Sequence, residues 1–120
     1  MAEQEAKFTT EQVGGTTWVR LRGPRITDQV YINELGDELV ALLENAERPD
    51  LLIDLEEVEF LSSSMLGKLI RLLKRAAQVG GRVRLCSIRP SIREVFEITQ
   101  LHKVFEIYPD ANEALGRHRP

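Results

Sequence analysis

Three consecutive serines, Ser62, Ser63 and Ser64, are the side chains of this sequence best suited to covalent modification. They precede a segment with helical apolar spacing, residues 66–77, so they lie where a helix begins. A serine at that position accepts a backbone hydrogen bond, and one of the three can simply cap the helix. The same position also favours an anion, because the helix dipole and free N–H groups point toward it. The serines are therefore either a cap or a phosphate acceptor.

If one of the serines is a phosphate acceptor, the acidic segment just upstream determines what the phosphate would do. Glu56, Glu57 and Glu59 precede the serines, and a phosphate would make this surface more acidic without breaking the fold. A partner matched to the neutral serine would then be repelled, since like charges at an interface oppose binding. The pattern is typical of a switch.

The segments that must position the serines include several strands. Gly14-Gly15 predicts a turn within a hairpin, and the apolar run at 51–55 is typical of a strand buried on both faces. The expected strands are residues 8–12, 17–21, 51–55, 83–87 and 104–108.

Helices are expected between these strands. Thr27 or Asp28 is suited to cap the first, and Gly80-Gly81 ends the one that follows the serines. Shorter helices are expected from Pro90 and from Pro109. The apolar face of the first helix should consist of Val30, Ile32, Leu35, Leu39, Leu42 and Leu43.

This order predicts an α/β fold. Strands separated by helices pair in parallel through right-handed crossovers, while the hairpin makes the sheet mixed. We expect a small mixed β-sheet of four to five strands, backed by helices mainly on one face. A single domain should span residues 6–116, with flexible ends at 1–5 and 117–120.

Composition excludes several classes of function. The formal net charge of the 120 residues is −3, and no concentrated basic face is visible, so nucleic acid is not an expected partner. The N-terminus is polar and no apolar stretch is long enough to span a bilayer, which indicates a cytoplasmic protein without a membrane span.

No residue pattern in the sequence indicates catalysis or metal binding either. The histidines, His102 and His118, fit neither a catalytic triad nor a metal site, and no phosphate-binding loop is present. We therefore expect no enzyme activity, no metal and no cofactor. Cys86 and Trp18 are expected to pack in the interior. Arg82, Arg84, Arg89 and Arg93 are interpreted mainly as solvated surface.

The ordered motifs resemble the anti-sigma-factor antagonist family, which is built on the STAS domain. Asp54-Leu55 and Val58-x-Phe60-Leu61-Ser62-Ser63-Ser64-Met65-Leu66-Gly67 occupy the places of that family's strand end and serine motif. Downstream, similar segments are Gly80-Gly81-x-Val83-x-Leu85, Pro90 to Thr99 and Leu101 to Ile107. The resemblance covers roughly residues 6–116.

The resemblance implies a partner and a modified residue. A kinase-type anti-sigma factor would bind the unmodified protein and phosphorylate Ser63, and a PP2C-type serine phosphatase would reverse this. Ser62 and Met65 replace the family's usual acidic residue and glycine, so Ser62 and Ser64 are alternative acceptors. Met65 faces either the core or the partner. The residues expected to bind the partner are Thr27, Asp28, Ser62, Ser63, Ser64, Met65 and Lys68.

Two alternatives use the same fold without a switch. The chain could be a non-catalytic scaffold in a larger signalling assembly, or a subunit of a lipid-transport complex. Neither needs a modified serine.

Overall fold

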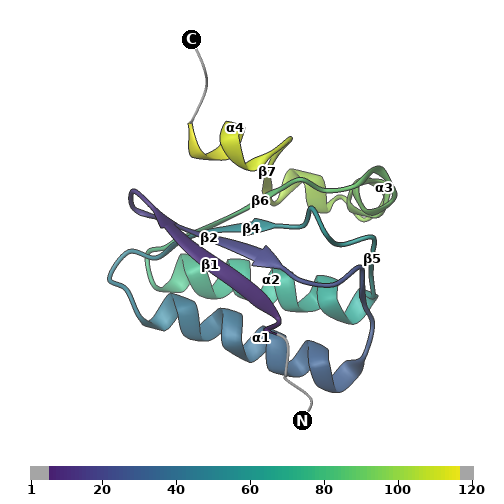
Figure 1. The fold of residues 1–120 in the computed structure, drawn as a ribbon, viewed down its shortest axis with the longest axis horizontal. Coiled ribbons are helices and arrows are strands. Elements are labelled where there is room, and N and C mark those ends of the chain that lie inside the picture. The colour runs from purple at the N-terminus through teal and green to yellow at the C-terminus, as the bar shows by residue number, and fades with distance from the viewer. Residues whose placement is uncertain (1–5, 117–120) are drawn as a thin grey trace.

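The central feature is a five-stranded mixed sheet, seen in a computed structural model that describes residues 6–116 (Figure 1). The strand order is β1-β2-β4-β6-β7, in which β1 is antiparallel to β2 and every other pair is parallel. This confirms the predicted α/β class with a small mixed sheet. The expected flexible ends, residues 1–5 and 117–120, lie outside the described residues. The strands are β1 (Phe8–Val13), β2 (Thr16–Leu21), β4 (Asp50–Asp54), β6 (Arg82–Cys86) and β7 (Glu106–Tyr108).

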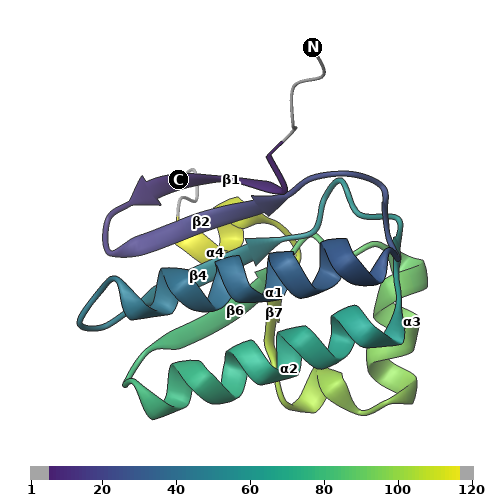
Figure 2. The same cartoon turned by 90° about the horizontal axis from the view of Figure 1, so that it is seen from below.

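Two long helices cover one face of this sheet. Helices α1 (Gln29–Glu44) and α2 (Ser63–Gln78) lie side by side beneath it, as Figures 1 and 2 show from two directions. Helix α3 (Pro90–Ile98) lies near the carboxyl ends of the parallel strands, and the short α4 (Ala111–Leu115) lies on the opposite face. The expectation that helices lie mainly on one face is therefore confirmed.

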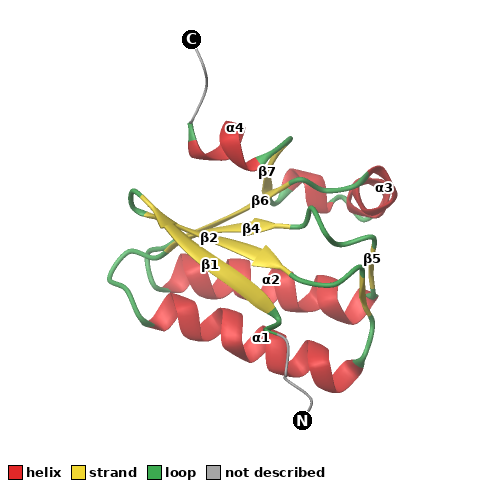
Figure 3. Cartoon of the chain, viewed as in Figure 1, coloured by secondary structure: helices red, strands yellow, loops and turns green. Residues whose placement is uncertain are grey.

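A second, very small sheet was not predicted. Strands β3 (Arg25–Ile26) and β5 (Phe60–Leu61) pair in parallel at the edge where α1 and α2 begin (Figure 3). Two residues are too few for any alternating pattern to appear in the sequence. The last strand is also shorter than expected, because the 3₁₀ turn Leu101–Lys103 precedes it and pairing starts at Glu106.

The core has two parts, one on each face of the sheet. The larger lies between the sheet and the helices α1, α2 and α3, and includes Leu51 and Ile53 of β4. On the other face, Leu52 packs with Trp18 and Cys86 under α4. Strand β4 is thus buried on both faces, as predicted. Val30 does not join this core, since 66% of it is exposed in the first turn of α1.

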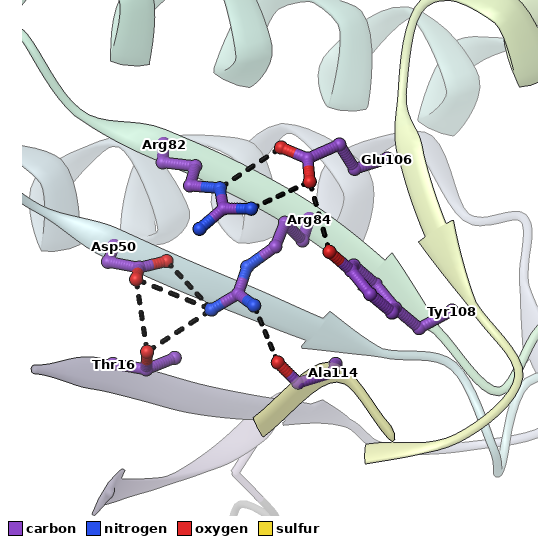
Figure 4. A network of polar contacts seen from close by, with 7 residues as sticks. All are labelled: Thr16, Asp50, Arg82, Arg84, Glu106, Tyr108 and Ala114. Atoms are coloured by element: carbon purple, nitrogen blue, oxygen red, sulfur yellow. Dashed lines mark hydrogen bonds and ion pairs between the residues drawn. The ribbon is translucent and has the colours of Figure 1, made fainter. Parts of the chain in front are cut away.

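One arginine predicted on the surface is buried instead. Arg84 is 5% exposed, and its guanidinium binds Asp50 and Thr16 at 3.2 Å each (Figure 4). It also donates a 2.6 Å hydrogen bond to the carbonyl of Ala114, which attaches α4 to the sheet. Buried charge needs such partners. A basic residue in an alternating strand gave no sign that three elements would supply them.

Candidate functional site

The head of α2 gives the three serines different environments. Ser62 is the N-cap, since its hydroxyl accepts a 3.2 Å hydrogen bond from the backbone N–H of Met65. Ser63 is the first helical residue and is exposed, while Ser64 is half-buried. Among residues 6–116, the hydroxyl of Ser63 has no hydrogen-bond partner. The cap and the accessible hydroxyl are therefore two separate residues.

Met65 belongs to the core and not to the surface. Its exposed fraction is 0%, so the expectation that it contacts a partner directly is wrong. Two steps along a helix turn the side chain by about 200°, which places Met65 inward while Ser63 points outward. The apolar side chain fills space between α2 and the sheet, where it packs in the larger core.

The small sheet brings the first turns of α1 and α2 together. Ile26 pairs with Leu61, and the backbone N–H of Ser62 donates to the carbonyl of Ile26 at 3.2 Å. Thr27 and Asp28 follow β3, just as the serines follow β5. The residues that the sequence suggested at the two helix starts therefore lie on neighbouring segments.

Asp28 and Thr27 differ in role within this edge. The carboxylate of Asp28 accepts a 2.9 Å hydrogen bond from the backbone N–H of Tyr31, so Asp28 is the N-cap of α1. Thr27 is exposed beside it. The sequence predicted Thr27 or Asp28 as the cap of this helix, and the structure shows that Asp28 is the cap.

Lys68 joins the two helices one turn further along. It is half-buried, and its aliphatic stem lies over Gly36 of α1, where an added Cβ would come within 2.9 Å of the lysine Cδ. A larger residue at position 36 would displace the lysine stem. Its stem thus has a packing role, and its terminal amine makes no ion pair among residues 6–116.

The loop before β5 carries exposed acidic side chains, of which Glu57 pairs with Arg22 at 3.6 Å. Glu56, Glu57 and Glu59 are all exposed. Asp54, in contrast, is buried, and accepts hydrogen bonds from the indole N–H of Trp18 and the backbone N–H of Glu56, each 2.9 Å long. Asp54 therefore shapes the loop, while the glutamates set its surface charge.

An apolar pocket of about 200 Å³ adjoins the same edge, and sequence reasoning did not find it. Phe60 and Val95, 44% and 40% exposed, form its open side, and the guanidinium of Arg25 stacks over the Phe60 ring at 4.9 Å. No single sequence motif could reveal it, because its walls come from segments about thirty residues apart. The lining residues are Glu59, Phe60, Leu61, Leu66, Ser91, Ile92 and Val95.

Two groups of the large sheet, Cys86 and Glu106, have shifted pKa values. Burial, and then the charge of Asp54, raises the pKa of the Cys86 thiol to about 12. The hydrogen bond from Arg82 lowers the pKa of Glu106. Neither group adjoins Ser63, and within the described residues no histidine or carboxylate binds its hydroxyl. The arrangement presents an accessible hydroxyl that no neighbouring group activates as a nucleophile.

Metal and membrane features give no further candidate within residues 6–116. No group of three histidine, cysteine, aspartate or glutamate side chains is placed to hold a metal ion. No helix in this range has the length and apolar character needed to cross a bilayer.

The sequence and the fold match a known family. The STAS domain model matches residues 7–114, so the chain belongs to the STAS domain family. It is 30% identical over 101 residues to a Bordetella bronchiseptica protein named as anti-sigma factor antagonist BtrV, covering 84% of each chain. The resemblance seen in the sequence is confirmed.

Solved structures give the same result at the level of the fold. An anti-sigma-factor antagonist (STAS) domain protein from Planctomyces limnophilus is 27% identical, with a TM-score of 0.81 over 93% of this chain and 97% of its own. The Bacillus cell fate determinant SpoIIAA in its phosphorylated form is 23% identical, with a TM-score of 0.69 over 93% and 99%.

Proposed function

We propose that this chain is an anti-sigma-factor antagonist whose binding is switched by phosphorylation of Ser63. The observation that carries the proposal is the exposed Ser63 hydroxyl at the head of α2, next to a different serine that caps the helix. The relative named as an anti-sigma factor antagonist supports the same function. In this function the chain is a non-catalytic regulator of transcription, which implies a cytoplasmic location.

Phosphorylation at Ser63 would leave the fold intact. The helix start has backbone N–H groups without intrahelical partners, and its dipole favours negative charge. Because the cap hydrogen bond uses the Ser62 hydroxyl, modification of Ser63 does not remove it. The added charge of about −1.5 to −2 would therefore change the surface and not the scaffold.

The surface change would act on a partner seated at this edge. Its contacts would include Thr27, Asp28, Ser63 and Ser64, with Lys68 at the margin. The loop just upstream of β5 contributes three exposed glutamates, so a phosphate would add to an acidic surface. A partner matched to the neutral hydroxyl meets like charge and leaves.

The adjacent apolar pocket would add a hydrophobic contribution to the binding of the partner. An apolar side chain of the partner placed against Phe60 and Val95 would remove their exposed surface from water. We propose that this partner is a kinase-type anti-sigma factor, which phosphorylates Ser63. A PP2C-type serine phosphatase would restore the binding state.

The test is phosphorylation by the cognate kinase-type anti-sigma factor with ATP, mapped by mass spectrometry. We expect one phosphate at Ser63, its loss in Ser63→Ala, and its retention in Ser62→Ala and Ser64→Ala. Calorimetry should show tight binding of that factor to the unmodified chain and at least tenfold weaker binding to Ser63→Glu. Phosphate at Ser62 or Ser64 with Ser63 unmodified would contradict the assignment.

A further inference from the structure

The outer surface of the helix layer carries two stripes of opposite charge. Helices α1 and α2 have 16 residues each, lie side by side and run in the same direction (Figures 1 and 2). Helix α1 has four acidic side chains and no lysine or arginine, while α2 has four basic side chains and no acidic one. These residues are Glu34, Asp37, Glu38 and Glu44 on α1, and Lys68, Arg71, Lys74 and Arg75 on α2.

Ion pairs within the chain use only part of this charge. Lys7 pairs with Glu34 and Glu38 at 3.5 and 2.9 Å, and Arg75 pairs with Glu44 at 3.0 Å. Among residues 6–116, no ion pair reaches Asp37 or the α2 side chains Lys68, Arg71 and Lys74. Opposite charges thus remain available on both stripes.

The shape of the layer allows another helix pair to approach. The outward positions of α1 recur at helical spacing, and all five are exposed. They include the small Ala41 and the apolar Val30, the latter 66% exposed. On α2, Gly67 has no side chain, and the space where its Cβ would lie is open. The surface of α2 is therefore low at this position, as the surface of α1 is at Ala41. The outward α1 positions are Val30, Glu34, Asp37, Ala41 and Glu44.

A groove of about 440 Å³ between the two helices adds room for side chains. It is open to solvent and has acidic and basic groups on its walls. Its lining residues are Val40, Glu44, Arg71, Lys74, Arg75 and Gln78.

We propose that a second copy of this chain docks on this layer, so that α1 of each copy lies on α2 of the other. The charges on one copy complement those on the next, which is the condition for a two-fold interface. The two-fold axis must run parallel to the helices and lie in the interface between the two copies. An axis across the helices would place α1 on α1 and α2 on α2, with like charges facing.

The axial positions of the charges fit this arrangement. Lys68 lies level with Gly36, and Arg75 level with Glu44, as their contacts show. An axis parallel to the helices keeps these levels across the interface. Along the axis, Asp37 then lies within about 5 Å of Arg71 of the other copy, given a rise of 1.5 Å per residue. Glu44 similarly comes level with Lys74 and Arg75.

The interface is electrostatic, so it should respond to salt. Sedimentation equilibrium of the full, unphosphorylated 120-residue chain should show dimers at about 0.01 M NaCl, and monomers at about 1 M, where the screening length is roughly 3 Å. A monomer at low salt up to about 1 mM protein would overturn the proposal. Phosphorylation plays no part in this experiment, so the result is independent of the function proposed above.

Charge exchange provides the decisive variants. The first variant, Arg71→Glu/Lys74→Glu, and the second, Asp37→Lys/Ala41→Lys, change exposed residues that make no ion pair among residues 6–116, so each should fold. Each alone places like charges across the interface and should be monomeric at low salt. Their equimolar mixture restores complementary charge and should form a heterodimer.

A matched control separates this surface from total charge. Arg93→Glu/Lys103→Glu makes the same change in net charge as Arg71→Glu/Lys74→Glu, but on α3 and the 3₁₀ turn, outside the helix layer. It should dimerise like the unaltered chain, and circular dichroism should show all three variants folded. A mixture that stays monomeric, or a control that dissociates equally, would refute the docking of α1 on α2.

Discussion

At the scale of single residues, the head of α2 separates three tasks among neighbours in the sequence. Ser62 holds the helix start, Ser63 offers its hydroxyl to solvent, and Met65 fills the core. A substitution at each position should therefore affect a different property. Stability should depend on Ser62 and Met65, and partner binding on Ser63.

Met65 provides the first stability test. Met65→Ala should lower the free energy of unfolding by about 2–5 kcal/mol, because it leaves a cavity in a fully buried site. Met65→Leu, which conserves volume, should cost less than about 1.5 kcal/mol. Urea denaturation followed by circular dichroism measures both. Equal stability of Met65→Ala and the unaltered chain would place this side chain outside the core.

Cys86 gives a prediction for alkaline pH. Burial raises its pKa from 9.0 to about 12, so folding favours the protonated thiol. The stabilisation is complete below the pKa that the Cys86 thiol has in the unfolded chain, and it disappears as pH rises from about 9 to about 12. Stability should therefore fall more steeply over this range than in Cys86→Ala, since lysines and tyrosines titrate in both proteins. Parallel slopes in urea titrations would contradict the shift.

At the scale of elements, the two-residue strands β3 and β5 have more influence than their size suggests. Their pairing places the caps of α1 and α2 on adjacent segments and thereby assembles the candidate partner site. A helix cap in this edge thus supports both stability and the candidate partner site.

Removing the cap hydroxyl should distinguish Ser62 from its neighbour. Ser62→Ala should lower the free energy of unfolding by about 1 kcal/mol, because the N–H of Met65 loses its acceptor. Ser63→Ala should change it by less than about 0.5 kcal/mol, as for other surface substitutions. Thermal denaturation of both variants gives the comparison. A larger loss of stability in Ser63→Ala than in Ser62→Ala would contradict the assignment of Ser62 as the cap.

The sequence predicted those elements whose pattern extends over several residues. The apolar spacing of α1 and α2 and the continuous apolar run of β4 are such patterns, and their order was enough to give the mixed sheet. The pairing of β3 with β5 was out of reach, because it joins two dipeptides from distant segments. The burial of Met65 and Arg84 depends on neighbours that only the folded chain provides.

At the scale of the whole molecule, Arg84 connects the sheet with the C-terminal helix. It binds Asp50 at the start of β4, Thr16 at the start of β2 and the carbonyl of Ala114 in α4 (Figure 4). Strands from both halves of the chain and the last helix are thus held by one buried cation.

Replacing this cation should loosen several elements together. Arg84→Met should lower the free energy of unfolding by about 3 kcal/mol, because it leaves the partly buried Asp50 without its main partner. Arg82→Met is the matched control, since it removes a half-exposed pair with Glu106 and should cost less than about 1 kcal/mol. Calorimetric unfolding of both variants measures the difference, and comparable losses would deny Arg84 its connecting role.

The position of Trp18 makes the chain its own optical reporter. The sole indole of the sequence lies 7% exposed beneath α4, bonded to Asp54 and stacked against the Arg20 guanidinium at 3.9 Å. It is on the sheet face away from α2 and hence remote from the serine hydroxyls. Intrinsic fluorescence should consequently record detachment of the C-terminal helix, yet stay nearly constant when a phosphate is added to Ser63.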